Sequence, residues 1–496
     1  MKIKSALISV FDKTGIDKLA KELVKNGVLL YSTGGTKKYL EGLGLSILAV
    51  EDQTNYPEVF GGRVKTLHPA IFGGILYRRD NESDNKELKE HQIPEIDLVV
   101  VDLYPFEETV ASGADHSSII EKIDIGGISL IRAAAKNYKF TSIISTKKQY
   151  DDFTNHYLNT NGSPTIEYRK KLAAEAFGIT MNYDKAISGY FQNKQRVTLR
   201  YGENPHQEAY FDGDIEGLFK KLNGKELSYN NLLDIDAAVS LITDVSDNES
   251  STFAILKHNN ACGCATRKTV FDAFKDALAS DPVSAFGGIL ITDRQIDFET
   301  AEKIDELFYE VCIAPSFTKE ALEVLTKKSK RIILEWSKME YKQDIVRSCL
   351  NGELVQERDI LNVNESKLTY PTIKKPSKQE VKDLLLADKI VKNTKSNAII
   401  LVKDGRLLSS GTGQTSRVDA LKQAIAKANE FNIDLKGSIM ASDAFFPFPD
   451  CVEIAAEAGI QHVIQPGGSI KDSLSIEKAN ELGLSMVMTG VRHFKH

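Results

Sequence analysis

Apolar runs alternate with amphipathic stretches along the first 150 residues. Three runs, at residues 5–10, 28–32 and 45–50, are separated by segments with the spacing of amphipathic helices. This order of strand, helix, strand, helix and strand predicts a parallel sheet. Two further runs, at residues 97–105 and 140–146, extend the sheet, since they are continuously apolar like strands covered on both faces.

The same alternation restarts after a predicted domain boundary near residue 195. Strands are expected at residues 251–258, 284–292 and 311–315, with helices between them. A break at residues 368–380 leads to a second segment, which opens with a helix and a two-stranded hairpin turning at Asp404 and Gly405. The second half of the chain is therefore expected to form two α/β lobes. Their shared order of elements suggests an internal duplication.

Composition excludes several classes of protein. The 63 Lys and Arg residues face 69 Asp and Glu residues, so no global basic field exists for a nucleic-acid backbone, and any bound anion needs a local site. The five cysteines are odd in number and absent from the first 261 residues, which favours a reducing compartment. No apolar stretch reaches the ~18 residues of a membrane span, and residues 6–10 are too short for a signal peptide. We expect a cytoplasmic enzyme or binding protein.

Two glycine-containing turns in the first half are candidates for phosphate binding. At residues 31–39 a strand enters a Thr-Gly-Gly-Thr turn before a helix, whose first amides favour an anion. At residues 61–69 Arg63 and Lys65 project to one face of an extended segment and form a possible phosphate clamp. The alternatives are an ordinary strand-to-helix turn and a solvated basic loop.

A third motif, at residues 123–137, carries two glycines before a helix of high propensity. Asp124 lies where an N-cap or a ligand is expected, and Arg132 and Lys136 share one helix face. Like charges at this spacing are unfavourable unless an anion lies between them. The alternatives are a plain helix cap and solvated cations.

The fourth motif, at residues 254–265, ends a buried strand with Lys257 and His258. A neighbouring cation lowers the pKa of an imidazole and favours the neutral base. The two side chains point to opposite faces of a regular strand, so they act together only if a turn begins here. Cys262 and Cys264 raise the alternative of a metal site, but their spacing is not C-x-x-C and no zinc-deaminase motif occurs.

Further clusters in the second half combine Asn, Ser and Arg with glycine turns and aromatic residues. This chemistry suits a planar heteroaromatic ligand with a phosphate or carboxylate, although each cluster could be an ordinary loop or packing contact. The clusters lie at residues 200–207, 281–288, 395–399, 411–419, 442–450 and 465–470.

Taken together and in this order, the motifs resemble a bifunctional purine-biosynthesis family. Its members combine phosphoribosylaminoimidazolecarboxamide (AICAR) formyltransferase with inosine monophosphate (IMP) cyclohydrolase. The resemblance covers nearly the whole chain and is carried by GGRVKTLHP, LYPF, DIGG, AAAKN, RYGENPHQ, DPVSAFGG, SRVDA and DAFFPFPD. It implies a methylglyoxal-synthase-like cyclohydrolase domain at residues 1–195. It also implies a formyltransferase domain at residues 196–496, made of two cytidine-deaminase-like lobes without zinc.

The resemblance also implies substrates and assembly. Formyl transfer from 10-formyltetrahydrofolate to AICAR would give formyl-AICAR, which then closes to IMP with loss of water. The family is homodimeric, with the transferase site formed across the subunit interface. The ligands are small molecules, and neither a nucleic acid, a membrane nor a catalytic metal is expected.

Site residues follow from the matching positions. The resemblance implies catalytic roles in cyclisation for Lys65, Tyr104, Asp124 and Lys136, and in formyl transfer for Lys257 and His258. The nucleotide at the first site would lie among Asp12, Lys13, Thr33, Gly34, Gly35, Thr36, Arg63, Thr66, Asp102 and Ile125. AICAR at the second site would be held by Arg200, Tyr201, Gly287, Glu310, Asn397, Arg417, Phe445 and Arg492. The folate would lie against Val418, Asp450, Ser469 and Ile470.

Three positions depart from the family pattern. Asp102 replaces the usual Asn and is expected to place a negative charge beside the nucleotide. Ala261 replaces a common Pro and is expected to loosen the turn after His258, and Glu310 matches a position that is Asp in some members. Two other readings stay open: a catalytically silent nucleotide-sensing regulator and a metal-dependent deaminase.

Overall fold

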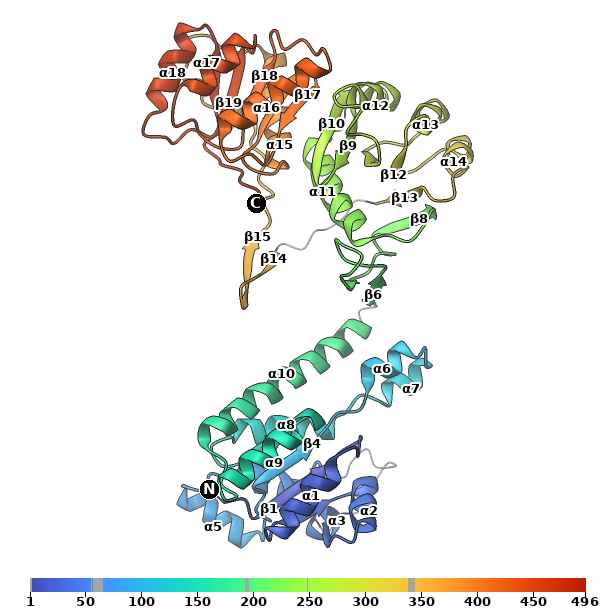
Figure 1. Ribbon diagram of the computed structural model, residues 1–496, viewed down its shortest axis with the longest axis vertical. Helices are drawn as coiled ribbons and strands as arrows, with labels where there is room; N and C mark the ends of the chain where they lie inside the picture. The colour runs from blue at the N-terminus through green and yellow to red at the C-terminus, as the bar shows by residue number, and fades with distance from the viewer. Residues whose placement is uncertain (1, 55, 57–65, 192–195, 248, 338–343) are drawn as a thin grey trace. The chain divides into compact units, whose positions relative to one another are not determined.

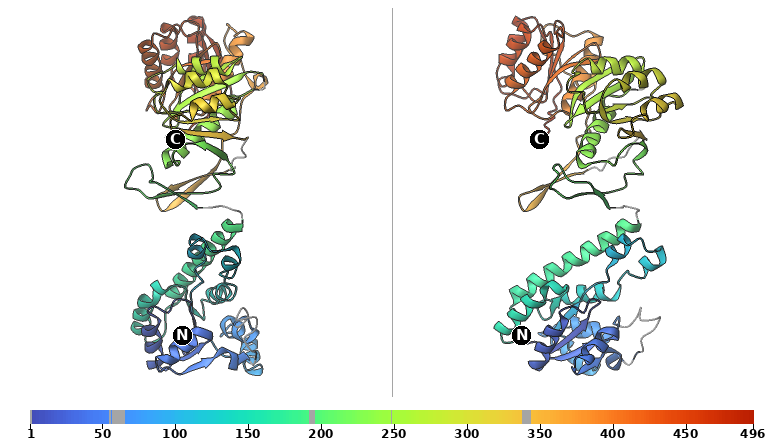
Figure 2. Two further views of the ribbon diagram at one scale, coloured as in Figure 1. Left: turned by 90° about the vertical axis from the view of Figure 1, so that its right-hand side faces the viewer. Right: turned by 45° about the vertical axis from the view of Figure 1, so that its right-hand side comes forward.

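The computed structural model describes residues 2–54, 56, 66–191, 196–247, 249–337 and 344–496. The chain divides into two compact units, Met1–Gln195 and Arg196–His496. Each unit is an α/β structure with its own sheet (Figures 1 and 2). Within the described residues, no helix combines the length and apolar character needed to cross a membrane.

The first unit contains a five-stranded sheet in the order β3-β2-β1-β4-β5. All neighbouring strands are parallel, as the alternating pattern predicts. Leu7, Ile8, Val99 and Val100 at its centre are fully buried, because helices cover both faces. The strands are β1 (Ser5–Ser9), β2 (Leu29–Ser32), β3 (Ile47–Ala49), β4 (Leu98–Val101) and β5 (Ser142–Ile144).

The helices of this unit connect the parallel strands and add one long element, α10, which runs beside α8 (Figure 1). The loops that follow β1, β2 and β4 meet at the carboxyl edge of the sheet, where ligands bind in open α/β folds. The helices are α1 (Ile16–Lys25), α2 (Gly34–Gly42), α3 (Val50–Thr54), α4 (Pro69–Leu76), α5 (Glu82–Glu90), α6 (Phe106–Ala111), α7 (His116–Ile120), α8 (Gly126–Lys136), η2 (Lys147–Gln149), α9 (Tyr150–Asn159) and α10 (Ile166–Phe191).

The second unit is built around an eleven-stranded sheet to which two lobes contribute. The elements of the first lobe are α11 (Tyr229–Val245), β9 (Ser251–Lys257), β10 (Asn260–Arg267), α12 (Val270–Leu278), β11 (Gly288–Thr292), α13 (Phe298–Asp305), β12 (Tyr309–Ala314), α14 (Lys319–Leu325) and β13 (Ile332–Trp336). Those of the second are α15 (Lys378–Lys392), β16 (Ile399–Lys403), β17 (Arg406–Gly411), α16 (Arg417–Glu430), β18 (Ile439–Ser442), α17 (Asp450–Glu457), β19 (His462–Gln465), α18 (Asp472–Glu481) and β20 (Ser485–Met488).

The two lobes have the same topology. In each, an antiparallel hairpin is followed by a strand antiparallel to its first member and then by two parallel strands. The hairpins meet through β10 and β17, which joins the lobes into one sheet. The same device supports both hairpin turns: Asp234 of α11 accepts the N–H of Asn259, and Asp383 of α15 accepts the N–H groups of Asp404 and Gly405. This correspondence supports the internal duplication that the order of elements suggests.

The remaining elements were not anticipated from the apolar pattern. Strand β8 extends the sheet edge beside β13, whereas the β14–β15 hairpin is mostly exposed and therefore lacks the alternation of a half-buried strand. These elements are β6 (Arg196–Leu199), β7 (Ala209–Asp212), β8 (Phe219–Asn223), β14 (Asp344–Cys349), β15 (Gly352–Glu357) and η3 (Glu365–Lys367).

Two helical glycines of the first unit provide a matched test of its packing. A Cβ on Gly74 would lie 1.9 Å from the carbonyl oxygen of Pro94, whereas a Cβ on Gly178 would meet nothing within 4 Å. We expect Gly74→Ala to destabilise this unit by about 2 kcal/mol and Gly178→Ala to stabilise it by about 0.5–1 kcal/mol. Hydrogen exchange of the full-length chain, followed in peptides from β1 and β4, measures both effects. Unchanged protection in Gly74→Ala would contradict this packing.

Candidate active sites

The turn from β2 into α2 is tied to the end of β1. Thr36 Oγ1 donates to the carbonyl oxygen of Val10 at 2.8 Å and accepts its N–H at 3.1 Å. The hydroxyl of Thr33 donates to Glu51. The side chains of Thr33 and Thr36, both predicted to hold a phosphate, therefore have structural partners within the protein. The groups available to an anion are instead the backbone N–H groups at Gly34 and Gly35, in the first turn of α2. The first N–H groups of a helix have no intrahelical acceptor, so they are available to an anion.

Asp102 follows β4 and supports the neighbouring loop with its carboxylate. Its oxygens accept the N–H groups of Phe11 and Asp12, the latter at 2.9 Å. Burial raises the pKa of Asp102, and these two hydrogen bonds oppose the shift. The carboxylate is thus engaged by the backbone of the loop that carries Lys13. The expected contact of Asp102 with the nucleotide stays a prediction.

Asp12 and Lys13 lie in this loop with different partners. Lys147 approaches Asp12 Oδ2 to 2.6 Å and, with hydrogen bonds from Thr14, holds the pKa of that carboxyl well below its usual range. Lys13 Nζ donates to the carbonyl oxygen of Phe11 at 2.9 Å. The ammonium group of Lys13 is thus held at the carboxyl edge of the sheet, near the first turn of α2.

Asp124 and Thr66 meet at the N-terminus of α8. Asp124 Oδ1 accepts the N–H of Gly127 at 2.6 Å, as a helix cap does. A Cβ on Gly127 would lie 2.5 Å from Asp124 Oδ2, and one on Gly126 would lie 3.2 Å from Thr66 Oγ1. A side chain at Gly127 would therefore displace the Asp124 carboxylate, and one at Gly126 would press on the Thr66 hydroxyl. Ile125 beside them is 59% exposed.

Lys122 is a residue of this region that the sequence motifs did not single out. Its Nζ lies 5.5 Å from the ring centre of Phe11 and 5.7 Å from that of Tyr104. The two rings contact each other edge to face at 5.4 Å. A cation–π contact depends on tertiary packing, so local sequence could not distinguish Lys122 from other surface lysines. Arg63 and Lys65 lie outside the described residues.

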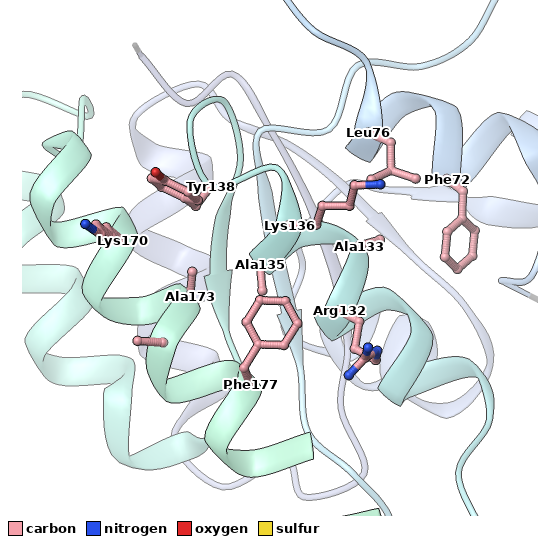
Figure 3. A pocket seen from close by; sticks show the side chains of 11 residues that line it. Phe72, Leu76, Arg132, Ala133, Ala135, Lys136, Tyr138, Lys170, Ala173 and Phe177 are labelled. Atoms are coloured by element: carbon pink, nitrogen blue, oxygen red, sulfur yellow. The ribbon is translucent and has the colours of Figure 1, made fainter. Parts of the chain in front are cut away.

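Lys136 occupies the opposite end of α8. Eleven residues separate the helix ends by about 15 Å at 1.5 Å per residue, so the fold does not place Lys136 beside Asp124. Instead, Lys136 lines a cavity of about 630 Å³ with Arg132 and apolar side chains of α4 and α10. Figure 3 shows its side chain pointing toward Leu76. Arg132, which lines the same cavity, lies over the ring of Phe177 at 5.5 Å.

In the second unit, Lys257 and His258 stand at the tip of the β9–β10 hairpin. His258 and Asn259 form its turn with φ angles of 51° and 64°, as in two-residue type I′ hairpins. The turn thus begins at His258, as joint action with Lys257 requires. Lys257 Nζ donates to the carbonyl oxygen of Phe286 at 2.7 Å. Ala261 lies opposite Leu256 in β10, so it follows the two-residue turn, and its expected effect on the turn stays a prediction.

Asp234 stabilises this turn from α11. Its Oδ1 accepts the N–H of Asn259 at 2.7 Å. Burial raises the pKa of Asp234, while this hydrogen bond and the nearby His258 lower it. A short-range motif could not identify Asp234, because it lies 25 positions before Asn259, with the rest of α11 and all of β9 between them.

The segment before β16 and the C-terminal residues approach the same hairpin. Asn260 Oδ1 accepts the N–H of Lys395 at 3.0 Å. Asn397 is held by backbone and side-chain hydrogen bonds to Gln414. Ser396 donates its N–H to the carbonyl oxygen of Lys495 at 2.9 Å. The fold therefore brings the hairpin tip, the Asn397 segment and the chain region around Arg492 together.

Aromatic residues of the second lobe line a cavity of about 370 Å³ that includes Ser469 and Ile470. Arg417 lies 5.6 Å from the ring centre of Phe445. Phe448 is 52% exposed and Ile470 fully exposed, so neither is a core residue. The remaining lining residues are Phe445, Pro447, Gly468 and Lys471. Three residues predicted for two ligands, Phe445, Ser469 and Ile470, thus share one cavity.

Other predicted residues have partners of their own. Arg200 donates to the hydroxyl of Tyr201 at 2.7 Å, and Glu310 pairs with Lys225 at 2.6 Å. Gly287 has a φ of 74° and donates its N–H to Phe308, beside the carbonyl that holds Lys257. Two residues predicted to contact folate begin helices: Asp450 opens α17, and Val418 lies in the first turn of α16.

Metal-ligating side chains do not gather in the part of the chain that the structure describes: it contains no group of three or more His, Cys, Asp or Glu suited to a metal. Burial raises the pKa of Cys262 and of Cys264 to about 12, which keeps both thiols protonated. The described part of the second unit thus presents His258 at a hairpin tip, the cations Lys257 and Arg417, and an aromatic cavity.

Two family models match this chain and define its class of protein. A methylglyoxal-synthase (MGS)-like domain model matches residues 15–129, and the AICARFT/IMPCHase bienzyme model matches residues 134–427. The fold and the matched families are thus those of a two-activity α/β enzyme. The chain belongs to the AICARFT/IMPCHase bienzyme family. It is a bifunctional enzyme of IMP biosynthesis with AICAR formyltransferase and IMP cyclohydrolase activities, which confirms the predicted fold class and function and does not support a silent regulator.

Full-length relatives support this assignment. Proteins described as "Bifunctional purine biosynthesis protein PurH" are 55% identical in Bacteroides thetaiotaomicron, covering 100% of this chain and 99% of the relative, and 46% identical in Persephonella marina, covering 99% and 100%. One from Bacillus cereus is 47% identical with the same coverage. The crystal structure of ForH is 35% identical, covering 38% of this chain and 96% of that chain, with a TM-score of 0.35.

An ion pair between Asp281 and Lys427 joins the two lobes, and its contribution is predicted to depend on pH. Burial raises the pKa of Asp281. The Lys427 ammonium and the hydrogen bonds from Ser284 together lower this pKa by more than burial raises it, so the net shift is downward. A carboxyl with a lowered folded-state pKa stabilises the fold above its unfolded value of about 3.9 and loses this contribution in acid.

We expect Asp281→Asn to reduce the free energy of unfolding by about 2 kcal/mol at pH 7 and by much less at pH 3. Trp336, the single tryptophan of the chain, lies in the second unit and reports its unfolding by urea through fluorescence. Glu430→Gln, an exposed carboxylate at the end of the same helix as Lys427, is the matched control. An equal loss at both pH values would contradict the ion pair.

Proposed function

We propose that the two activities occupy separate units. The first unit closes formyl-AICAR to IMP, and the second transfers the formyl group of 10-formyltetrahydrofolate to AICAR. The observation that carries this assignment is the convergence of the Lys257–His258 hairpin tip with the Asn397 segment in the second unit. The separate cluster of Asp124, Thr66 and Tyr104 in the first unit supports the other half.

In formyl transfer the exocyclic amine of AICAR attacks the formyl carbon. His258 accepts the proton that the amine loses and returns it to N10 of the folate, which leaves as tetrahydrofolate when its C–N bond to the formyl carbon breaks. Lys257 stabilises the negative charge on the formyl oxygen, as a preorganised cation does in acyl transfer. Its hydrogen bond to the carbonyl of Phe286 supports this role, because it holds the ammonium beside the turn. Arg417 and Phe445 would hold AICAR, and the cavity at Ser469 and Ile470 would hold the folate.

In cyclisation the amide nitrogen of formyl-AICAR attacks the formyl carbon, and the formyl oxygen leaves as water. Asp124 and Tyr104 are proposed to move these protons, and the first turn of α2, Lys13 and Thr66 to hold the phosphate. Paired acid and base groups serve such a reaction well. Arg63 and Lys65 keep their proposed roles from the family resemblance.

The proposed role of Lys136 in cyclisation depends on the proposed homodimer. Within one copy, Lys136 lies about 15 Å along α8 from the Asp124 end. Its cavity is bordered by Phe177, which is 39% exposed, and α10 also carries Met181, which is 65% exposed. A second copy covering this apolar surface would bury it and allow Lys136 to take part in a shared site. We further propose a cytoplasmic enzyme of small-molecule substrates, since a net charge of −6 offers no general attraction to nucleic acid.

His258 provides the first test of the proposed assignment. We expect His258→Asn to lower formyl transfer by about 10²–10⁴-fold, the usual contribution of a general base. Asn tolerates the positive φ of this position, so the turn is preserved better than in His258→Ala. Mass analysis of reactions with AICAR and 10-formyltetrahydrofolate would quantify tetrahydrofolate, formyl-AICAR and IMP.

Cyclisation of supplied formyl-AICAR by the same variant is the internal control and is expected to remain within twofold of the native rate. Loss of both activities in a folded variant would refute the separation of the two sites. Native rates of formyl transfer would remove His258 from the proposed role.

A fragment of residues 1–195 tests the domain assignment. Its sheet and core belong to one compact unit, so we expect it to fold and to convert formyl-AICAR to IMP at a measurable rate without the second unit. Absorbance of IMP formation and circular dichroism check activity and folding. A folded fragment without activity would show that the cyclohydrolase site needs residues beyond 195.

A further inference from the structure

The hydroxyl of Tyr183 on α10 bridges the loop that leads to α8. Tyr183 Oη accepts the N–H of Asp124 at 2.8 Å and donates to the carbonyl oxygen of Lys122 at 2.7 Å. The phenol thus donates its single proton to residue 122 and accepts the N–H of residue 124, so it holds both ends of a three-residue segment. Burial raises the pKa of Tyr183 to about 12, so the hydroxyl keeps its proton near neutral pH.

The ring of Tyr183 is itself held in place. Phe106 contacts it edge to face, with ring centres 6.2 Å apart, and Phe106 is only 2% exposed. Phe106 begins α6, two residues after Tyr104. Tyr183 therefore packs against the segment that carries Tyr104 and hydrogen-bonds the segment that carries Asp124.

Both side chains of the bridged loop point to groups of the proposed cyclohydrolase site. Lys122 Nζ lies over the rings of Phe11 and Tyr104, and the Asp124 carboxylate accepts the N–H of Gly127. The backbone between them determines where both side chains start. A shift of this backbone would move the carboxylate and the ammonium together, and displacements of about 1 Å are enough to slow a reaction about 10²-fold.

We propose that Tyr183 is a positioning residue for ring closure: its hydroxyl fixes the backbone of residues 122–124 and thereby the Asp124 carboxylate. It acts through Asp124 and not on the reacting atoms. This inference rests on the proposed role of Asp124 in cyclisation. The phosphate subsite at the first turn of α2 comes from other segments, so substrate affinity is not expected to depend on Tyr183.

The variant Tyr183→Phe tests this proposal, because it removes one oxygen and keeps the ring that packs against Phe106. In the full-length chain, we expect kcat for supplied formyl-AICAR to fall about tenfold and KM to stay within twofold. Formyl transfer by the second unit of the same chain should stay within twofold. Hydrogen exchange should accelerate in the peptide covering residues 122–127 and remain native in β5.

Tyr190→Phe is the matched control on the same helix. Its hydroxyl lies 2.6 Å from His116 Nδ1, and its ring also contacts Phe106. The substitution thus removes a comparable hydrogen bond that does not involve the Asp124 loop. We expect its kcat and KM for cyclisation to equal those of the native chain. An equal loss in both variants would assign the effect to general packing of α10 and overturn the proposal.

The variant Asp124→Asn separates the proposed role of Asp124 in cyclisation from the positioning role of Tyr183. If Asp124→Asn is impaired and Tyr183→Phe has native kcat or native exchange, the positioning role is refuted and the proposed function stands. If Asp124→Asn cyclises at the native rate, the proposed role of Asp124 fails, and the inference about Tyr183 fails with it. A rise in KM with unchanged kcat in Tyr183→Phe would also overturn the proposal.

Discussion

Backbone N–H groups at the ends of strands need hydrogen-bond acceptors, and in this protein partly buried carboxylates supply them where the proposed chemistry lies. Asp102 holds the loop after β1, Asp124 the first turn of α8, and Asp234 the turn at His258. Burial raises the pKa of Asp102 and of Asp234, while the hydrogen bonds they accept favour the charged form. The hydrogen bonds from the N–H groups of Asp12 and Gly127 are partly buried, and a hydrogen bond to a charged acceptor contributes about 1.5–3 kcal/mol. The positions of Lys13, Gly127 and His258 all depend on this constraint.

In both of the duplicated lobes, an aspartate of the preceding helix supports the turn of the hairpin. Asp234 and Asp383 occupy corresponding places, each the sixth residue of the helix before its hairpin, and each accepts backbone N–H groups of the hairpin turn. In the second lobe that turn is Asp404-Gly405, whose residues adopt positive φ easily. In the first lobe the turn begins with His258, which like Asn and Asp adopts positive φ more readily than most residues. The proposed base therefore occupies a turn that suits its own conformational preference and that Asp234 supports.

Much of the fold was predictable because its strands, helices and turns depend on residue types within a few positions of one another. The parallel sheet of the first unit, the hairpin at Asp404 and the two-lobe order followed from runs of apolar residues and turn residues. Of the candidate sites, the sequence indicated that Asp124 lies at the start of a helix, which is confirmed. That Phe445, Ser469 and Ile470 line one cavity came from the tertiary structure, and their ligand contacts stay predictions. The β14–β15 hairpin escaped prediction, since strands that bury neither face lack an alternating pattern.

By itself, the sequence determined the order of the elements, the places of the turns and the family, because these depend on residue types within a few positions of one another. Tertiary structure alone decided that Asp102 serves the backbone of residues 11 and 12, that Lys122 lies over Tyr104, and that Tyr183 bridges the Asp124 loop. The residues in these contacts lie from 18 to 91 positions apart, so the contacts exist only once helices and sheet have packed, and no local pattern encodes which distant partner a polar side chain will meet.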